Sequence, residues 1–186
     1  MSTLDLTKMA ALVLMLAGCA TGAGAPEASQ EKMRYGLGTP LTDRELAGWN
    51  IDVAIDGKGL PPGRGSVAEG KVVYAAKCAA CHGAKGEGKP ANRLVGGAVK
   101  PPAPVVKTVG SFWPHATTLY DYVYRAMPWD KPQSLSANEV YAVSAYVLHL
   151  NGIVPEGAVL DAKTLPQVRM PNRDGFTAPD PRPDTH

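Results

Sequence analysis

One motif constrains this chain more than any other feature: Cys78, Cys81 and His82 stand close together in the stretch AAKCAACHGA. A C-x-x-C pair alone fits a thiol redox couple, half of a zinc site, a disulfide or the attachment site of a c-type haem. The adjacent histidine favours the last, because C-x-x-C-H is the haem c signature. Two cysteines three positions apart lie on one side of a helical turn, so both sulfurs can reach the haem vinyl groups while the next imidazole projects toward the iron.

The rest of the sequence weighs against two of the alternatives. A zinc site needs two more Cys or His ligands at comparable spacing, and only His115, His149 and the terminal His186 remain, scattered along the chain. A thioredoxin-like pair needs alternating strands and helices, which the hydrophobic pattern does not show. The formal net charge of +2, with no run of Lys or Arg, gives no indication of nucleic-acid binding.

Residues 1–18 predict a signal peptide of the lipoprotein type. Lys8 precedes the apolar run MAALVLMLAG, which is too short to span a bilayer as a mature helix, and the run leads into LAGC, ending at Cys19. We therefore expect export to the periplasm, with a lipidated Cys19 anchoring the mature chain to the membrane. An ordinary secretory signal cut nearby is the alternative. Giving Cys19 to the lipid and the C-x-x-C pair to haem leaves no cysteine unassigned.

The remaining chain divides into a helical centre and two irregular extensions. Residues 19–65 begin with a small, polar tether and continue with large apolar side chains among Gly and Pro, so we expect them to lie on the domain surface or to wrap a partner. Residues 66–152 form the predicted monohaem domain. Residues 153–186 form an irregular C-terminal extension and a proline-rich tail.

Two capping boxes mark the first and last helices of the centre. Ser66 and Glu69 predict a helix over about 67–79. Ser136 and Glu139 predict the last helix, in the stretch SANEVYAVSAYVLHLNG, where apolar residues recur at helical spacing.

A shorter helix is predicted between them, over 118–126. Thr117 or Thr118 is its expected cap, and Pro128 forces its end because proline disfavours helical geometry in the residue before it. Residues 83–114 are rich in Gly and Pro, and no regular element of any length is expected there.

The sixth ligand of the iron decides whether such a protein carries electrons or binds small molecules. Methionine raises the reduction potential and closes the site, histidine lowers the potential, and an open position permits ligand binding. Residues 19–186 offer Met33, Met127 and Met170, with His115 or an open position as alternatives. Most lone methionines are packing residues, which is the simplest role for Met170.

The order of these features resembles that of class I cytochromes c: a first helix, C-x-x-C-H, an irregular loop, short helices, a methionine often followed by proline, and a last helix crossing the first. The resemblance implies an all-α, class I cytochrome c fold, with three to four helices around one covalent haem c and long irregular N- and C-terminal extensions. It implies covalent attachment at Cys78 and Cys81, His82 as the proximal ligand and Met127, in YRAMPWD, as the distal ligand.

Two further side chains are candidates for contacts with the haem propionates. Trp113 and Arg125 could each donate a hydrogen bond to a propionate oxygen. Trp113 as a core residue and Arg125 as a solvated one are equally acceptable interpretations.

Stretches outside the haem motif, such as KTVGSFWPHATTLYDYVYRAMPW and LPQVRMPNRDGF, resemble the cytochrome c subunit of sulfite and sulfur dehydrogenases, the SoxD type of SoxCD. The similarity covers about Met33 to Phe176. It implies an electron-transfer subunit that accepts electrons from a molybdenum-cofactor subunit oxidising a sulfur compound and passes them to a soluble cytochrome c. It also implies that residues 31–65 and 153–176 are arms that wrap the partner, with simple packing on the haem domain as the alternative.

The sequence departs from some SoxD-type subunits, which carry a second haem domain, because it contains one C-x-x-C-H. It also contains no molybdenum-binding motif. The identity of the molybdenum partner therefore stays open. The alternatives are a free-standing periplasmic electron carrier and a haem enzyme or sensor with an open sixth site.

Overall fold

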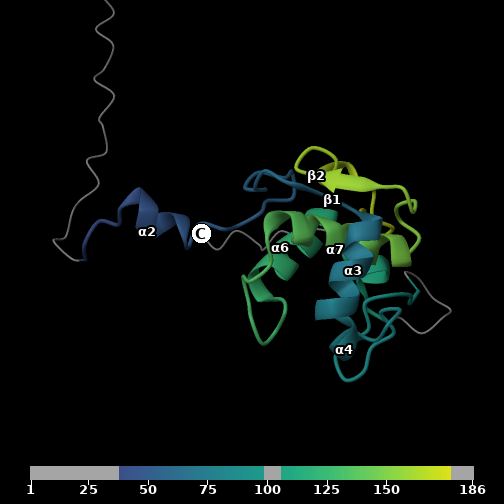
Figure 1. Ribbon diagram of the computed structural model, residues 1–186. Coiled ribbons are helices and arrows are strands. Elements are labelled where there is room, and N and C mark those ends of the chain that lie inside the picture. Colours follow the sequence, from purple (N-terminus) through teal and green to yellow (C-terminus); the bar gives the residue numbers. More distant parts are fainter. Residues whose placement is uncertain (1–37, 99–105, 177–186) are drawn as a thin grey trace, which may run out of the picture. The chain divides into compact units, whose positions relative to one another are not determined.

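The structure is a computed structural model that describes residues 38–98 and 106–176 (Figure 1). The predicted signal peptide, Cys19, Met33 and the proline-rich tail lie outside these residues. The chain divides into two units, Met1–Leu41 and Thr42–His186, and the second contains all the helices and strands named here. In chain order these are α2 (Asp43–Ala47), β1 (Arg64–Ser66), α3 (Val67–Lys77), α4 (Ala79–His82), α5 (Val109–Phe112), α6 (Ala116–Ala126), α7 (Ala137–Leu150), β2 (Val159–Asp161) and the 3-10 helix η2 (Leu165–Gln167).

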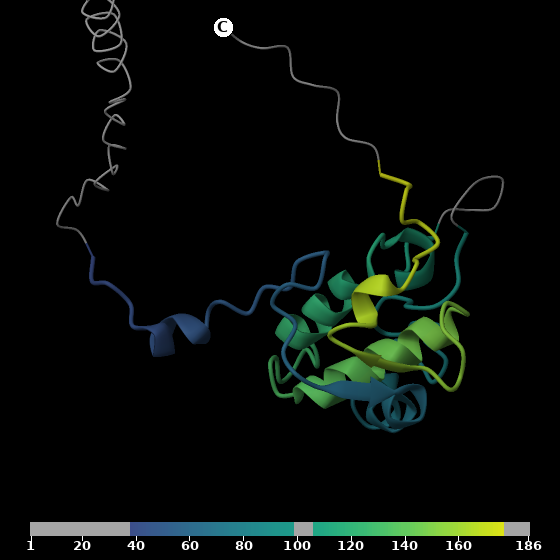
Figure 2. The same ribbon diagram turned by 90° about the horizontal axis from the view of Figure 1, so that it is seen from above.

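Helices α3 and α7 form the centre of the fold, and both begin at the capping boxes that the sequence predicts. The Ser66 and Ser136 side chains accept from the backbone N–H groups of Glu69 and Glu139, and each glutamate reaches back to its cap. The two helices cross: Figure 2 looks nearly along α3, while α7 runs across the view. The crossing is close because Gly70 is buried there, where a Cβ would overlap the carbonyl oxygen of Ala142.

Helix α6 confirms the predicted end but not the predicted cap. It stops at Ala126, before the Met127–Pro128 bond, as expected for a residue that precedes proline. Its N-cap is His115, which makes no side-chain capping bond. Thr117 is instead buried in the first turn, with its hydroxyl donating to the carbonyl of Ile55 at 3.4 Å.

Two short elements contradict the expectations for the loop-rich regions. Residues 83–114 contain α5, whose capping box is Thr108 with Ser111, a serine in the position that Glu usually takes. The N-terminal extension contains α2, capped by Thr42 and Glu45. Both helices are too short to produce the periodic pattern on which a sequence prediction depends.

The all-α prediction omits one small sheet. Strands β1 and β2 pair antiparallel, with Arg64 opposite Asp161 and Ser66 opposite Val159. The sheet joins the residues before α3 to the C-terminal extension, as Figure 1 shows. Three-residue strands of this kind are stabilised by the elements they join rather than by local preference.

The hydrophobic core surrounds α7, in which every residue from Val140 to Leu148 is buried. Leu160, Leu165 and Met170 of the C-terminal extension are also buried in this core. These three side chains of the C-terminal extension therefore pack on the domain. Among the helices of residues 38–98 and 106–176, none is long and apolar enough to cross a membrane.

Candidate functional site

The C-x-x-C-H motif forms a tight helical turn at the end of α3. Cys78 separates α3 from α4, and its carbonyl accepts from the N–H groups of Cys81 and His82 at 3.1 and 2.9 Å. Cys78 and Cys81 form no disulfide; Cys78 is half-buried and Cys81 is exposed. The turn therefore presents two sulfurs about one helical turn apart, with the histidine directly after them.

The imidazole of His82 is oriented by one hydrogen bond. Its Nδ1 lies 2.8 Å from the backbone carbonyl oxygen of Asn92. A carbonyl can only accept, so Nδ1 carries the proton and Nε2 is the nitrogen available to a metal. Metal-ligating histidines usually donate their second ring N–H in this way, which fixes the ring and raises its basicity. The arrangement fits an axial ligand to haem iron.

Three further bonds hold this turn against its surroundings. The carbonyls of Cys81 and His82 accept from the N–H groups of Ala91 and Gly88, at 2.9 and 2.8 Å. The hydroxyl of Tyr74 donates to the carbonyl of Gly83 at 2.9 Å. The loop after α4 therefore folds back onto the motif that precedes it.

The environment of the cysteines disfavours thiol redox chemistry. Burial raises the pKa of the Cys78 thiol to about 11, despite the opposing charge of Lys77. Reactive thiols have a lowered pKa, because the thiolate is the nucleophile. Within the described part of the chain, no group of three or more His, Cys, Asp or Glu side chains could hold a metal ion by itself.

A haem also needs apolar side chains to contact its ring. Among the half-buried apolar side chains that pack against the core are Leu94, Trp113, Val123 and Tyr124. They come from the loop after α4, the end of α5 and helix α6, which are the elements between His82 and Met127 in the chain. Such partly covered side chains fit a large apolar ring.

The candidate distal ligands occupy opposite ends of α6. Met127 is half-buried at the C-cap, with its N–H donating to Val123 at 3.0 Å, and His115 is the N-cap. A helix of this length spans roughly 16 Å, so the two side chains cannot approach one iron position equally. Burial and the nearby charge of Arg173 lower the pKa of His115. Met170 is buried in the core, where the packing interpretation places it.

The two candidate propionate contacts differ in their surroundings. Trp113 packs against the core and meets the ring of Tyr122 edge-to-face, with centroids 5.6 Å apart. The Arg125 guanidinium is paired with Asp52 at 2.8 Å and Asp121 at 2.7 Å. Asp121 also accepts from the N–H of Val53, so this cluster ties the N-terminal extension to α6.

Sequence reasoning missed Asn92 and Tyr74 as parts of this site. Asn92 acts through its backbone carbonyl, which every residue type has, so no side-chain signal marks it. Tyr74 lies within the predicted first helix, and its hydroxyl contact depends on how the loop returns. Both contacts are products of tertiary structure.

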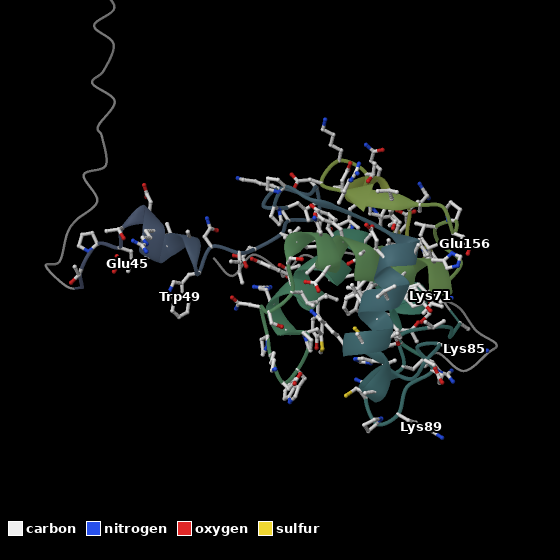
Figure 3. All side chains as sticks on the ribbon, viewed as in Figure 1. Glu45, Trp49, Lys71, Lys85, Lys89 and Glu156 are labelled. Atoms are coloured by element: carbon white, nitrogen blue, oxygen red, sulfur yellow. The ribbon has the colours of Figure 1, made fainter. Side chains whose placement is uncertain are left out.

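Exposed basic side chains surround the motif. Lys85, Lys89 and Arg93 lie on the loop that follows His82, and Lys71 lies on α3. Figure 3 shows Lys71, Lys85 and Lys89 projecting outward from these segments. Glu87 is the acidic residue among them, and its carboxylate accepts from the backbone N–H of Lys85 at 2.7 Å.

Comparisons with known proteins find a matching family model and a related dehydrogenase. Residues 65–147 match the family model described as cytochrome c oxidase, cbb3-type, subunit III. A thiosulfate dehydrogenase of Stutzerimonas stutzeri strain A1501 is 35% identical over 89 residues, which are 47% of this chain and 28% of that protein. The chain thus spans little more than a quarter of the length of that relative.

The similarity to a solved structure is more extensive. A chain in the crystal structure of the sulfane dehydrogenase SoxCD from Paracoccus pantotrophus is 40% identical, with a TM-score of 0.75. The match covers 79% of this chain and 73% of that chain. Since residues 66–152 make up less than half of this chain, the shared fold includes parts of both the centre and the extensions.

Proposed function

This chain belongs to the c-type cytochromes of the SoxD type, and from that premise we propose that it passes electrons from a molybdenum-cofactor sulfur or sulfite dehydrogenase subunit to a soluble cytochrome c. Membership implies covalent haem c, which when bound supplies an iron that cycles between the ferric and ferrous states. The observation that carries the proposal is the motif turn itself, with the His82 Nδ1–H directed to Asn92. The expected location is the periplasm.

In this proposal each site residue has one task. Cys78 and Cys81 would hold a single haem through thioether bonds, and His82 would ligate its iron through Nε2. Met127 would be the second ligand, and a thioether ligand excludes small molecules and raises the reduction potential.

The N-terminal extension supplies a contact with the molybdenum subunit. Asp52 and Val53 are tied to α6, but the residues before them leave large apolar side chains in solvent. Leu46 is 45% exposed and Trp49 is 81% exposed, and no residue of α2 is buried. Tryptophan is enriched among the side chains that dominate protein interfaces. The shared extensions of the SoxCD chain support this assignment.

The first experiment tests the closed, six-coordinate site. We expect the oxidised protein to show a weak far-red band from sulfur-to-iron ligation. The band should disappear in Met127→Ala and persist in Met170→Leu, which keeps the volume of a core side chain. Rapid binding of carbon monoxide to the reduced wild-type protein would contradict the proposal and favour an enzyme or sensor.

The second experiment tests the partner. The tagged chain, isolated from the periplasm, should copurify with a molybdenum-cofactor protein, and its haem should be reduced when a sulfur substrate is added. Trp49→Ala should weaken the copurification. Trp129→Ala is the matched control, because Trp129 is 83% exposed but lies outside the extension. Absence of any molybdenum protein would favour a free-standing carrier, and equal losses in both variants would remove the assignment to the extension.

A further inference from the structure

Asn151, at the C-cap of α7, joins two backbone segments that are far apart in the sequence. Its side-chain N–H group donates to the carbonyl of Leu94 at 3.2 Å and to that of Val147, in its own helix, at 2.9 Å. Its side-chain oxygen accepts from the N–H of Gly96 at 3.1 Å. One amide therefore holds the loop at Leu94–Gly96 against the end of α7.

The loop held by Asn151 is the one that orients the proximal histidine. Asn92, whose carbonyl accepts from His82 Nδ1, lies two residues before Leu94. On the other side of the loop, the N–H groups of Leu94 and Val95 donate to the carbonyl of Gly86 at 2.9 and 3.1 Å. The segment that carries the Asn92 carbonyl is thus fixed from the motif side by backbone bonds and from the α7 side by Asn151.

Few side chains could replace Asn151 in this role. Helix α5 approaches so closely that a Cβ on Gly110 would overlap the Asn151 side-chain oxygen. An open cleft of about 270 Å³ borders the same place and is lined by Val95, Gly96, Gly97, Gly110, Leu150, Asn151 and Pro171. Leu94 packs against the core, and the hydrogen bonds of Asn151 fix the backbone on either side of it.

We propose that Asn151 is a positioning residue for the proximal ligand: it fixes the loop so that the Asn92 carbonyl stays within hydrogen-bond distance of His82 Nδ1. This inference rests on the proposed role of His82 as iron ligand. The Nδ1–H bond raises the basicity of the imidazole, and a more basic ligand stabilises ferric iron. Loss of Asn151 therefore weakens the bond and shifts the reduction potential to a more positive value.

The test uses the holoprotein with Asn151→Leu, which removes all three side-chain bonds at similar volume. We expect a more positive reduction potential. In the reduced protein we expect the His82 Nδ1 proton to exchange with solvent roughly tenfold faster, since one ordinary hydrogen bond corresponds to about that factor. Asn151→Ser, which retains a small polar group, is the second variant and should show the same direction with a smaller change.

Asn138 provides the matched control. Its side-chain oxygen accepts from the N–H of Arg64 at 2.9 Å, so it also ties a backbone segment to α7, but at the other end of the helix. Asn138→Leu should lower stability and leave both the potential and the proton exchange unchanged. If the Asn151 variants lose stability alone, as Asn138→Leu does, the positioning role is wrong. The far-red band tests Met127 as the distal ligand, so its outcome does not depend on the outcome for the Asn151 variants.

Discussion

At the scale of the residue, the site depends on hydrogen bonds to backbone carbonyls. His82 and Tyr74 each donate to a carbonyl of the loop that follows the motif, and Asn151 holds the same loop from α7. The sequence marks Cys78, Cys81 and His82 as the candidates for haem binding, because haem c attachment requires those side chains at that spacing. It could not predict their supports, since a carbonyl acceptor is independent of residue type.

Tyr74→Phe removes one of these supports. We expect a loss of about 1 kcal/mol in the free energy of unfolding, the usual contribution of one hydrogen bond, because the carbonyl of Gly83 loses its donor. Tyr120→Phe is the control. The Tyr120 hydroxyl is buried and has no hydrogen-bond partner among the described residues, so its removal should be neutral or stabilising. Denaturant titration of both holoproteins measures the difference, and a comparable loss in Tyr120→Phe would indicate that its hydroxyl has a partner.

At the scale of the element, the crossing of α3 and α7 holds the fold together. Two glycines allow it: β1 brings Gly65 and α3 brings Gly70 against the backbone of Ala142. Tyr74 and Tyr146 pack at the same crossing, with ring centroids 5.3 Å apart. The helices themselves could be predicted, because a capping box is a local signal. Helix α5 and the β1–β2 sheet could not, because tertiary contacts stabilise them.

Gly70→Ala should break this crossing. Alanine favours a helix by about 1 kcal/mol over glycine. Its Cβ, however, would overlap the backbone of Ala142, and overpacking of this kind costs roughly 1–3 kcal/mol or more. We expect net destabilisation, measured by thermal unfolding. Gly157→Ala is the matched control, because a Cβ there meets nothing within 4 Å and the substitution should be neutral or stabilising.

The ion pair between Lys77 of α3 and Glu139 of α7 predicts that the stability of the fold depends on pH. The hydrogen bond from Lys77, at 2.8 Å, and those from Ser136 lower the pKa of Glu139 to about 2. Since this value lies below the unfolded-state pKa of about 4.3, the stabilisation is present above that pH and is lost as the pH falls toward 2. Glu139→Gln should therefore cost up to about 1 kcal/mol at pH 7, a modest value because the pair is partly exposed.

Stability measurements between pH 7 and pH 2 check this expectation. The difference between Glu139→Gln and the wild-type protein should shrink below about pH 4. The Ser136 side chain caps α7 in both proteins, so the comparison isolates the effect of the Glu139 charge. A difference that stays constant across this range would contradict the electrostatic origin.

At the scale of the whole molecule, positive charge is concentrated in one segment, and the hydrophobic core includes residues beyond the last long helix. Residues 71–93 contain five Lys or Arg and one Glu, whereas the formal net charge of the entire chain is only +2. The core, in turn, extends past α7 to Met170. The sequence could not predict this extension of the core, because its buried residues are spaced irregularly among prolines and turns.

The charge distribution predicts a salt-dependent electron transfer. Positive charge beside the exposed Cys81 should attract anionic redox reagents, and salt should screen the attraction. The rate with hexacyanoferrate(III) should therefore fall as ionic strength rises, and fall further in the Lys85→Glu/Lys89→Glu variant. Lys163→Glu, an exposed lysine beyond β2, is the control with the smaller effect. An equal effect of all these changes would show that net charge alone determines the rate.

Truncation after Gly152 should prevent stable folding. It removes Leu160, Leu165 and Met170, all of them buried. Burial of such side chains contributes about 1.5–3 kcal/mol each, which together approaches the whole stability of a typical domain. A chain that ends after Phe176 keeps all three and is the control. Circular dichroism and cooperative thermal unfolding distinguish the two, and a truncated protein with a sharp transition would show that the core closes without this segment.

The burial of Met170 also has a consequence for biogenesis. A ribosome makes the chain from its N-terminus, so the cysteines are complete long before the last core side chain exists. The core therefore cannot close until the chain is present as far as Met170. In the proposed function, haem would be attached at Cys78 and Cys81 after export, by a machinery that acts before this last segment folds against α7.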